Sequence, residues 1–300
     1  MKLHLEILAA SPPDRWGSAM RRAVSVVATT LALALALLVA PAPAEAASPP
    51  LPSSIAALGD SITRAFDVCC YYGDHPSHSW TTGDSSLDSV RSHYERIRAL
   101  NPAIAGHQHN DAVTGAKMVN GPAQAANAVA QGAQYVTILL GANDLCTSSV
   151  ATMTPTETFR QQFETTMATL DPDRRGVRVF VSSIPDVVHL WEVLHTNVAA
   201  RLVWGVARIC QSVLAVSNGD AQRQAVAAHE IELNKVLGDV CGGYGNCRFD
   251  NLATYHFQFS AGTCRSSISS TRTWTASASS PTRPGLSPGG AAACEPDRRC

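Results

Sequence analysis

Residues 55–63 read IAALGDSIT, and this stretch orders the interpretation of the whole chain. The apolar run before Gly59 predicts a buried β-strand. Glycine allows a sharp turn, and Ser61 then stands just past the carboxyl end of the strand, where a helix can begin. A hydroxyl held there lies near backbone N–H groups that can stabilise an oxyanion. The same residues also fit an ordinary turn in which Asp60 or Ser61 caps a helix.

Length and composition indicate one globular domain. The chain has 300 residues, of which 45% are hydrophobic and 16% charged, which is enough apolar material for one sizeable core. The formal net charge of −1 gives no indication of a nucleic-acid partner. His75 and His78 have the spacing of metal ligands, but no carboxylate pattern lies nearby, so we expect no metal site there. The oligomeric state does not follow from the sequence.

Residues 1–46 predict a secretory signal peptide. Two arginines precede an apolar run over residues 23–40, and residues 44–46 read AEA, which fits a small-x-small cleavage site. Met20 is an alternative start. The competing interpretation is a transmembrane anchor, because the run is near the lower length limit for spanning. We expect export, an extracellular protein and no stable membrane span after cleavage.

Because exported proteins meet an oxidising environment, the nine cysteines are candidates for disulfide bonds. Three of them lie in a C-terminal tail that differs in composition from the rest. The remaining six form an even set of disulfide candidates: Cys69, Cys70, Cys146, Cys210, Cys241 and Cys247. Cys241 and Cys247 flank a glycine-rich loop and could close a small ring, whereas the other pairings do not follow from the sequence.

Strands and helices are expected to alternate along the chain. The apolar runs predict strands near residues 55–59, 104–113, 135–140, 177–183 and 248–255. The longer periodic stretches predict helices over residues 87–100, 122–131, 155–170, 190–215 and 220–240. This alternation favours an α/β fold with a parallel sheet covered on both faces. Sites in such sheets gather at the carboxyl ends of strands, and Ser61, Gly115 and Asn143 each follow an expected strand.

Three stretches in this order resemble the SGNH, or GDSL-type, esterase and lipase family. They are GDSIT at residues 59–63, NDAVTG at residues 110–115 and GAND at residues 141–144. The resemblance covers about residues 55–260. It implies a flavodoxin-like three-layer α/β/α sandwich around a parallel sheet. It also implies a hydrolase that acts on a small ester or lipid substrate without a metal or organic cofactor.

The resemblance also implies a role for each matching residue. Ser61 would be the nucleophile and would form an acyl-serine intermediate. The backbone N–H groups of Ser61 and Gly115 and the side-chain amide of Asn143 would form the oxyanion hole. Glycine fits at 115 because a side chain would block close approach of the backbone.

The sequence departs from the family in its catalytic base. The family carries a late Asp-x-x-His-Pro block, and this chain has none. Asp186 and His189 have the right spacing but come too early and lack the proline. His256 remains as the candidate base, with Asp250 only a guessed partner. Without a base, a serine is a weak nucleophile.

The C-terminal tail offers an explanation for the missing base. We expect a hydrolase domain over residues 47–260 and an aberrant or disordered tail over residues 261–300. An offset reading frame of residues 262–287, with suitable third codon bases, can encode the missing block as D-L-V-H-P. We therefore hypothesise a frameshift and an impaired esterase. The alternatives are a non-catalytic secreted binding protein and a carbohydrate O-deacetylase, which would share the same residues.

Overall fold

The computed structural model divides the chain into two compact units, Met1–Pro50 and Leu51–Cys300, and the helices and strands described below belong to the second. The structure describes residues 50–68, 72–171, 176–260, 276–277 and 291–292. The expected signal peptide, Cys69, Cys70 and most of the tail therefore lie outside the described residues. Within the tail, β6 (Ala276–Ser277) and β7 (Ala291–Ala292) form an antiparallel pair.

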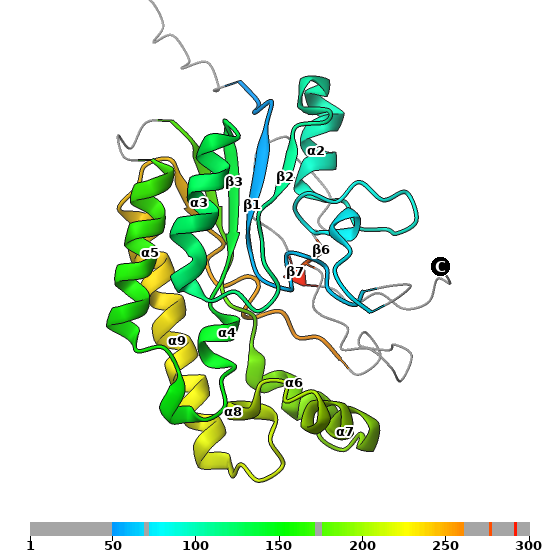
Figure 1. Cartoon of the computed structure of the whole chain (residues 1–300), viewed down its shortest axis with the longest axis vertical. Coiled ribbons are helices and arrows are strands. Elements are labelled where there is room, and N and C mark those ends of the chain that lie inside the picture. Colours follow the sequence, from blue (N-terminus) through cyan, green and yellow to red (C-terminus); the bar gives the residue numbers. More distant parts are fainter. Residues whose placement is uncertain (1–49, 69–71, 172–175, 261–275, 278–290, 293–300) are drawn as a thin grey trace, which may run out of the picture. The chain divides into compact units, whose positions relative to one another are not determined.

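The centre of the described domain is a five-stranded sheet in the order β2-β1-β3-β4-β5 (Figure 1). The strands are β1 (Ile55–Gly59), β2 (Gln108–Asn110), β3 (Tyr135–Leu139), β4 (Arg178–Val181) and β5 (Cys247–Phe249). Every neighbouring pair is parallel. This confirms the α/β fold with a parallel sheet that the alternating pattern predicts. Since the strands are parallel, their carboxyl ends all lie at the same end of the sheet.

Helices cover both faces of this sheet. On one face lie α3 (Gly121–Ala130), α5 (Thr156–Leu170) and α9 (Asp220–Gly242), and on the other lies α2 (His93–Leu100) (Figure 1). Successive strand residues point to opposite faces. Leu58 accordingly joins the core under α5 and α9, whereas Ile55 packs with α2.

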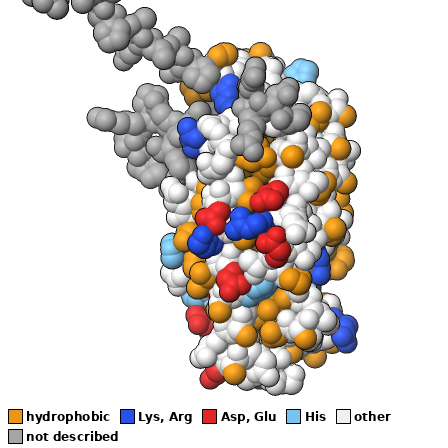
Figure 2. All heavy atoms as spheres, turned by 90° about the vertical axis from the view of Figure 1, so that its left-hand side faces the viewer, with side chains coloured by type: hydrophobic (Ala, Val, Ile, Leu, Met, Phe, Trp, Pro, Cys, Tyr) orange, Lys and Arg blue, Asp and Glu red, His pale blue; other side chains and the backbone are white. Residues whose placement is uncertain are grey.

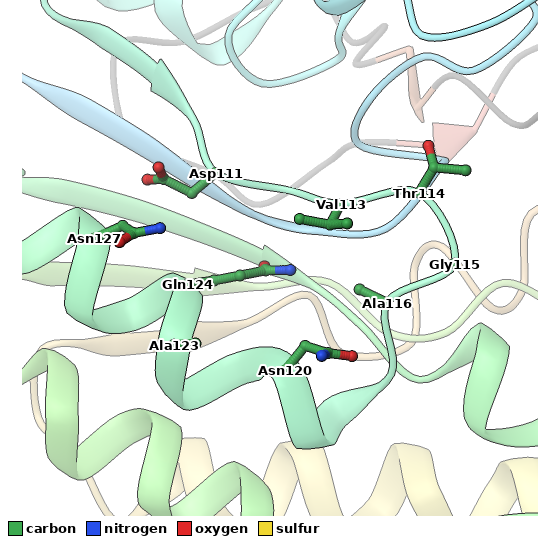
Figure 3. A pocket seen from close by; sticks show the side chains of 9 residues that line it. All are labelled: Asp111, Val113, Thr114, Gly115, Ala116, Asn120, Ala123, Gln124 and Asn127. Carbon is green, nitrogen blue, oxygen red and sulfur yellow. The ribbon is translucent and has the colours of Figure 1, made fainter.

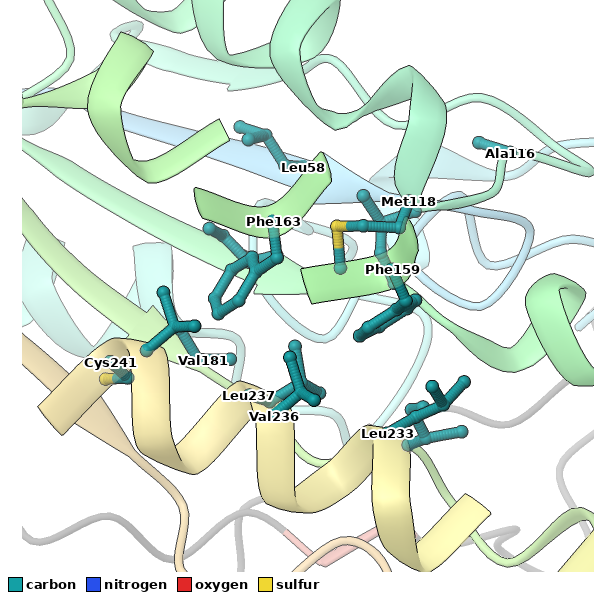
Figure 4. Packing of buried hydrophobic residues seen from close by; sticks show 14 of the residues in the cluster. Leu58, Ala116, Met118, Phe159, Phe163, Val181, Leu233, Val236, Leu237 and Cys241 are labelled. Atoms are coloured by element: carbon teal, nitrogen blue, oxygen red, sulfur yellow. The ribbon is translucent and has the colours of Figure 1, made fainter. Parts of the chain in front are cut away.

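The larger core lies between the sheet and α5 and α9. Figure 4 shows Phe159 and Phe163 of α5 facing Leu233 and Leu237 of α9, with Met118 beside them. All five side chains are fully buried. Burying such side chains contributes about 1.5–3 kcal/mol each and holds the helices against the sheet.

Shorter helices complete the domain. They are α4 (Ala142–Leu145), α6 (Val187–Leu194), α7 (Val198–Val206) and α8 (Gln211–Leu214), with 3-10 turns at Pro76–His78, Pro102–Ile104, Met118–Asn120 and Val150–Thr152. The single helix expected over residues 190–215 is therefore wrong. Asn197 starts a new helix there, because its Oδ1 accepts from the N–H groups of Ala199 and Ala200. Cys210 has a left-handed backbone (φ 42°), which interrupts the helical run before α8.

Further boundaries differ from the sequence prediction. Of the strand expected over residues 104–113, only Gln108–Asn110 is strand. The helix expected from residue 87 begins only at His93, because Ser92 and Glu95 form a capping box. The last strand stops at Phe249 instead of continuing to residue 255. There the Asp250 carboxylate accepts from the backbone N–H groups of Leu252 and Thr254 and turns the chain.

Two disulfides lie among the described residues. Cys241 and Cys247 are bonded and close the small ring that the sequence predicts. Cys146 and Cys210, a pairing that the sequence left open, join the end of α4 to the start of α8. Among the described residues, no helix combines the length and apolar character needed to cross a bilayer.

Arg223 of α9 holds α6 and α8 in place. Its side chain donates to the carbonyl oxygens of Val213 (3.1 Å), Ala215 (3.1 Å) and Asn218 (2.7 Å). Its guanidinium carbon lies 3.5 Å from the ring centroid of Trp191. With only 6% of its surface exposed, Arg223 is an internal anchor.

The outer face of α5 and α9 is polar by contrast. Figure 2 shows acidic and basic side chains gathered in the middle of this face. Arg160 and Lys235 both pair with Asp239 there, at 3.3 Å and 2.7 Å. These pairs are partly exposed and contribute little to stability.

We predict that Arg223→Lys lowers the free energy of unfolding by about 2–4 kcal/mol, because lysine keeps the charge but cannot serve three carbonyls and the Trp191 ring together. Urea denaturation measures the change. Arg160→Lys is the matched control and should cost less than about 1 kcal/mol. Equal losses in the two variants would contradict the anchoring role of Arg223.

Candidate active site

The strand order brings the three family-like stretches to one edge of the sheet. β2, β1 and β3 are neighbours. Ser61 follows β1, Gly115 lies in the segment after β2, and Asn143 lies in α4 directly after β3. These three residues are therefore close in the fold although far apart in the sequence.

The side chain of Asn143 links the other two stretches. Its Nδ2 donates to Oδ2 of Asp60 (3.2 Å) and to the carbonyl oxygen of Ala116 (2.9 Å). Asp60 precedes Ser61, and Ala116 follows Gly115. Both hydrogens of the amide are thus engaged, so an incoming oxyanion has to replace one acceptor. The bond to Asp60 is the longer of the two.

Ser61 is half-buried, and its hydroxyl makes no hydrogen bond to any described residue. The expected helix start at this point is wrong. The chain instead forms a series of turns. In these turns the backbone N–H of Arg64 donates to the carbonyl of Asp60 (3.0 Å), and the backbone N–H of Phe66 donates to the carbonyl of Ser61 (2.9 Å). Ala65 adopts a left-handed backbone (φ 50°), which prevents a continuous helix.

Gln124 of α3 holds the strand end in front of Ser61. Its Oε1 accepts from the N–H of Gly59 (2.8 Å), and its Nε2 donates to the carbonyl of the same residue (3.0 Å). A Cβ at Gly59 would lie 2.1 Å from Oγ1 of Thr63, so this position requires glycine. Sequence reasoning missed Gln124. The available signal was a lone polar residue on the otherwise small, buried face of α3.

Two more glycines shape the site through their backbone. Gly115 has φ +85°, and a Cβ there would meet nothing within 4 Å, so it is the left-handed backbone that favours glycine. Gly141 has φ +128°, and a Cβ there would lie 2.4 Å from Cδ1 of Ile184. Gly141 therefore allows the sharp turn from β3 into α4 that delivers Asn143.

Two buried carboxyl groups brace these turns. Asp60 accepts from the N–H of Ile62 (2.8 Å), and Asp144 accepts from the N–H of Met118 (2.9 Å). Burial raises the pKa of Asp60 to about 7, and the nearby charge of Asp144 adds to this shift. Burial likewise raises the pKa of Asp144. Near neutral pH, Asp60 is therefore poised between its neutral and charged forms.

A groove of about 340 Å³ lies beside Gly115, between the segment after β2 and α3 (Figure 3). Its lining consists of Asp111, Val113, Thr114, Gly115, Ala116, Asn120, Ala123, Gln124 and Asn127. The groove combines aliphatic groups with side-chain amides. It offers space for part of a small organic substrate next to the candidate oxyanion hole.

His256 lies elsewhere in the fold, after the edge strand β5. Its side chain is exposed, and its ring packs edge-on against Tyr255. No hydrogen bond joins the His256 ring to any described residue. The carboxylate of Asp250 accepts from the hydroxyl of Ser183 (2.9 Å) and from backbone N–H groups of its own turn. The described residues thus do not bring His256 and Asp250 together as a base and its partner.

His189 is engaged outside the candidate site. One ring nitrogen lies 2.8 Å from the carbonyl oxygen of Phe259 and the other 3.1 Å from the Glu192 carboxylate. Asp186 accepts from the N–H of His189 and caps α6. The Asp-x-x-His spacing there is a helix cap. Among residues that the structure describes, no three His, Cys, Asp or Glu side chains cluster as metal ligands would.

We predict that Asp60→Asn changes the pH dependence of stability. Folded Asp60 keeps its proton up to about pH 7, whereas the unfolded chain releases it near the ordinary pKa of 3.8. Between these values the folded protein binds more protons, so its stability falls as pH rises. The wild type should therefore lose up to about 4 kcal/mol relative to the variant between about pH 4 and about pH 8.

Urea unfolding of both proteins at the two pH values measures this difference. Any constant cost of the new amide cancels in the comparison. A stability difference that does not depend on pH would contradict the raised pKa.

One family of known proteins matches most of the length of this chain. The model of the family described as GDSL-like Lipase/Acylhydrolase matches residues 55–274, a range that ends inside the tail. Among curated proteins, none matches this chain. A solved structure similar to the chain is the extracellular lipase from Streptomyces rimosus, with 17% sequence identity over 70% of this chain and 85% of that one. Its TM-score of 0.37 is too low to carry an argument. On the family match over most of its length, the chain belongs to the GDSL-like lipase/acylhydrolase family.

Proposed function

We propose that this chain is a secreted serine hydrolase that cleaves carboxylic esters through an acyl intermediate on Ser61. The observation that carries the proposal is the Asn143 amide, which is bonded at once to the neighbour of Ser61 and to the neighbour of Gly115. A single polar group thus couples a candidate nucleophile to a candidate oxyanion hole.

The proposed reaction uses these groups in sequence. The Ser61 hydroxyl attacks the ester carbonyl, and the oxyanion is stabilised by the N–H groups of Ser61 and Gly115 and by the Asn143 amide. The oxyanion replaces Asp60 as an acceptor of Asn143. This exchange costs less when Asp60 is neutral, because a neutral carboxyl is the weaker acceptor. The bond from the carbonyl carbon to the alcohol oxygen then breaks, and the alcohol leaves with the proton that Ser61 lost. Water attacks the acyl group next, so the acid is released and a proton from the water restores the Ser61 hydroxyl.

Substrate and location follow from the same features. The groove beside Gly115 suits one arm of a small ester or lipid. The disulfides Cys146–Cys210 and Cys241–Cys247 favour an oxidising compartment and hence export.

The base is the incomplete part of the proposal. His256 is the remaining candidate, but its side chain is exposed, and its ring packs edge-on against Tyr255 among the described residues. We propose that the original base belonged to an Asp-x-x-His-Pro block that a frameshift removed from residues 261–300, and that the chain as it stands is a weak esterase. The same exposure of His256 favours the alternative of a non-catalytic secreted binding protein.

We predict that a fluorophosphonate probe labels the wild-type chain slowly on Ser61, because the candidate oxyanion hole would stabilise the negative charge that develops on the oxygen of the probe even where the base is weak. Mass spectrometry locates the label. Ser61→Ala should abolish it, and Ser86→Ala, a change at an exposed serine, should not. Absence of wild-type labelling would support the binding protein instead.

We also predict that a frame-restored chain, carrying D-L-V-H-P in place of the present tail, hydrolyses p-nitrophenyl acetate at least about 100-fold faster, since a general base contributes that much or more. Steady-state kinetics of the two chains, with His256→Gln in each, provide the measurement. Equal rates that also fall with His256→Gln would identify His256 as the base and contradict the frameshift account.

A further inference from the structure

Helix α7 carries an exposed apolar stripe. Val198, Leu202 and Val206 are 69%, 66% and 79% exposed. Their spacing of four residues puts them on one face of the helix. Trp204 lies on the opposite face and is buried. Exposed aliphatic side chains that line up on one helix face form a small continuous apolar surface.

The stripe lies beyond the carboxyl ends of the strands, which is also the end of the sheet that carries the candidate site. α6 begins at Val187, shortly after the carboxyl end of β4, and α7 follows it. Figure 1 shows α6 and α7 beyond the end of the sheet at which α4 lies. The disulfide between Cys146 and Cys210 joins the end of the segment that contains α6 and α7 to the end of α4, the helix that carries Asn143.

The charges within α7 and the turn that follows it are positive. Residues 198–209 include Arg201 and Arg208 and no acidic residue. Neither arginine forms an ion pair with a described residue. The Nε atom of Arg201 is buried and has no hydrogen-bond partner among the described residues. An apolar helix face flanked by cations that have no ion pair is typical of a segment that lies on an anionic lipid surface.

The size of the stripe separates a lipid surface from a second copy of the chain. A stable protein interface buries about 800 Å² on each partner. Three aliphatic side chains expose only a few hundred Å². Shallow insertion into a bilayer needs no more than this, because each buried methylene contributes about 0.8 kcal/mol.

We propose that α7 docks this protein on lipid bilayers with anionic headgroups, with the stripe inserted among the acyl chains and Arg201 and Arg208 near the headgroups. The proposal deepens the proposed function, because it presents the edge of the sheet that carries Ser61 to esters held in a lipid surface. Docking itself does not require hydrolysis, so the two can be tested apart.

Flotation with vesicles tests the proposal. The wild type should float with vesicles of phosphatidylcholine and phosphatidylglycerol. The double variant Leu202→Gln with Val206→Thr should bind about tenfold less tightly, from the loss of buried methylenes. Leu100→Gln is the matched control, because Leu100 is 73% exposed but lies on α2. Circular dichroism melting confirms that each variant is folded.

A second double variant tests the contribution of the two arginines to binding apart from that of the apolar stripe. Arg201→Gln with Arg208→Gln should weaken binding to the mixed vesicles and leave binding to pure phosphatidylcholine vesicles unchanged. The proposal is overturned if the wild type does not float, if the Leu202 and Leu100 variants bind equally, or if light scattering shows dimers that the stripe variant abolishes. Ser61→Ala should still float. A wild type that floats without hydrolysing any ester contradicts only the proposed function.

Discussion

The candidate site depends on the side-chain amide of Asn143. Its two hydrogen bonds cross from α4 to the end of β1 and to the segment after β2. The amide reaches this place because Gly141 adopts a backbone (φ +128°) that other residues avoid, and a Cβ there would also lie 2.4 Å from Cδ1 of Ile184. One amide side chain, through its two hydrogen bonds, and one glycine therefore hold the three stretches together.

The wider fold supports this contact. The end of α4 is tied to α8 by the Cys146–Cys210 disulfide and by Ser212, whose hydroxyl donates to the carbonyl of Leu145 (2.6 Å). Arg223 in turn holds the chain after α8 to α9. Contacts made by α8 and α9 thus limit how α4 can move at the candidate site. The stability of the helical excursion and the geometry of the candidate oxyanion hole are for this reason connected.

The candidate oxyanion hole is better assembled than the candidate base. The described residues assemble Ser61 and its candidate oxyanion hole at neighbouring strands β1, β2 and β3, whereas His256 follows the edge strand β5 and faces solvent. Stabilisation of an oxyanion and activation of a serine are separate contributions to rate. A chain with the first and little of the second would bind esters and turn them over slowly. The exposed stripe of α7 would keep such a chain at a lipid surface.

The sequence by itself determined the fold class and the order of the motifs, because apolar runs and turn residues such as Gly59 act locally. It also predicted the Cys241–Cys247 bond, since six residues separate the two thiols. The roles of Ser61, Gly115 and Asn143 stay predictions. Only the tertiary structure decided that α6, α7 and α8 are separate helices, that Cys146 meets Cys210, and that Gln124 holds Gly59. These last two contacts join residues separated by 64 and 65 positions, and no local pattern encodes them.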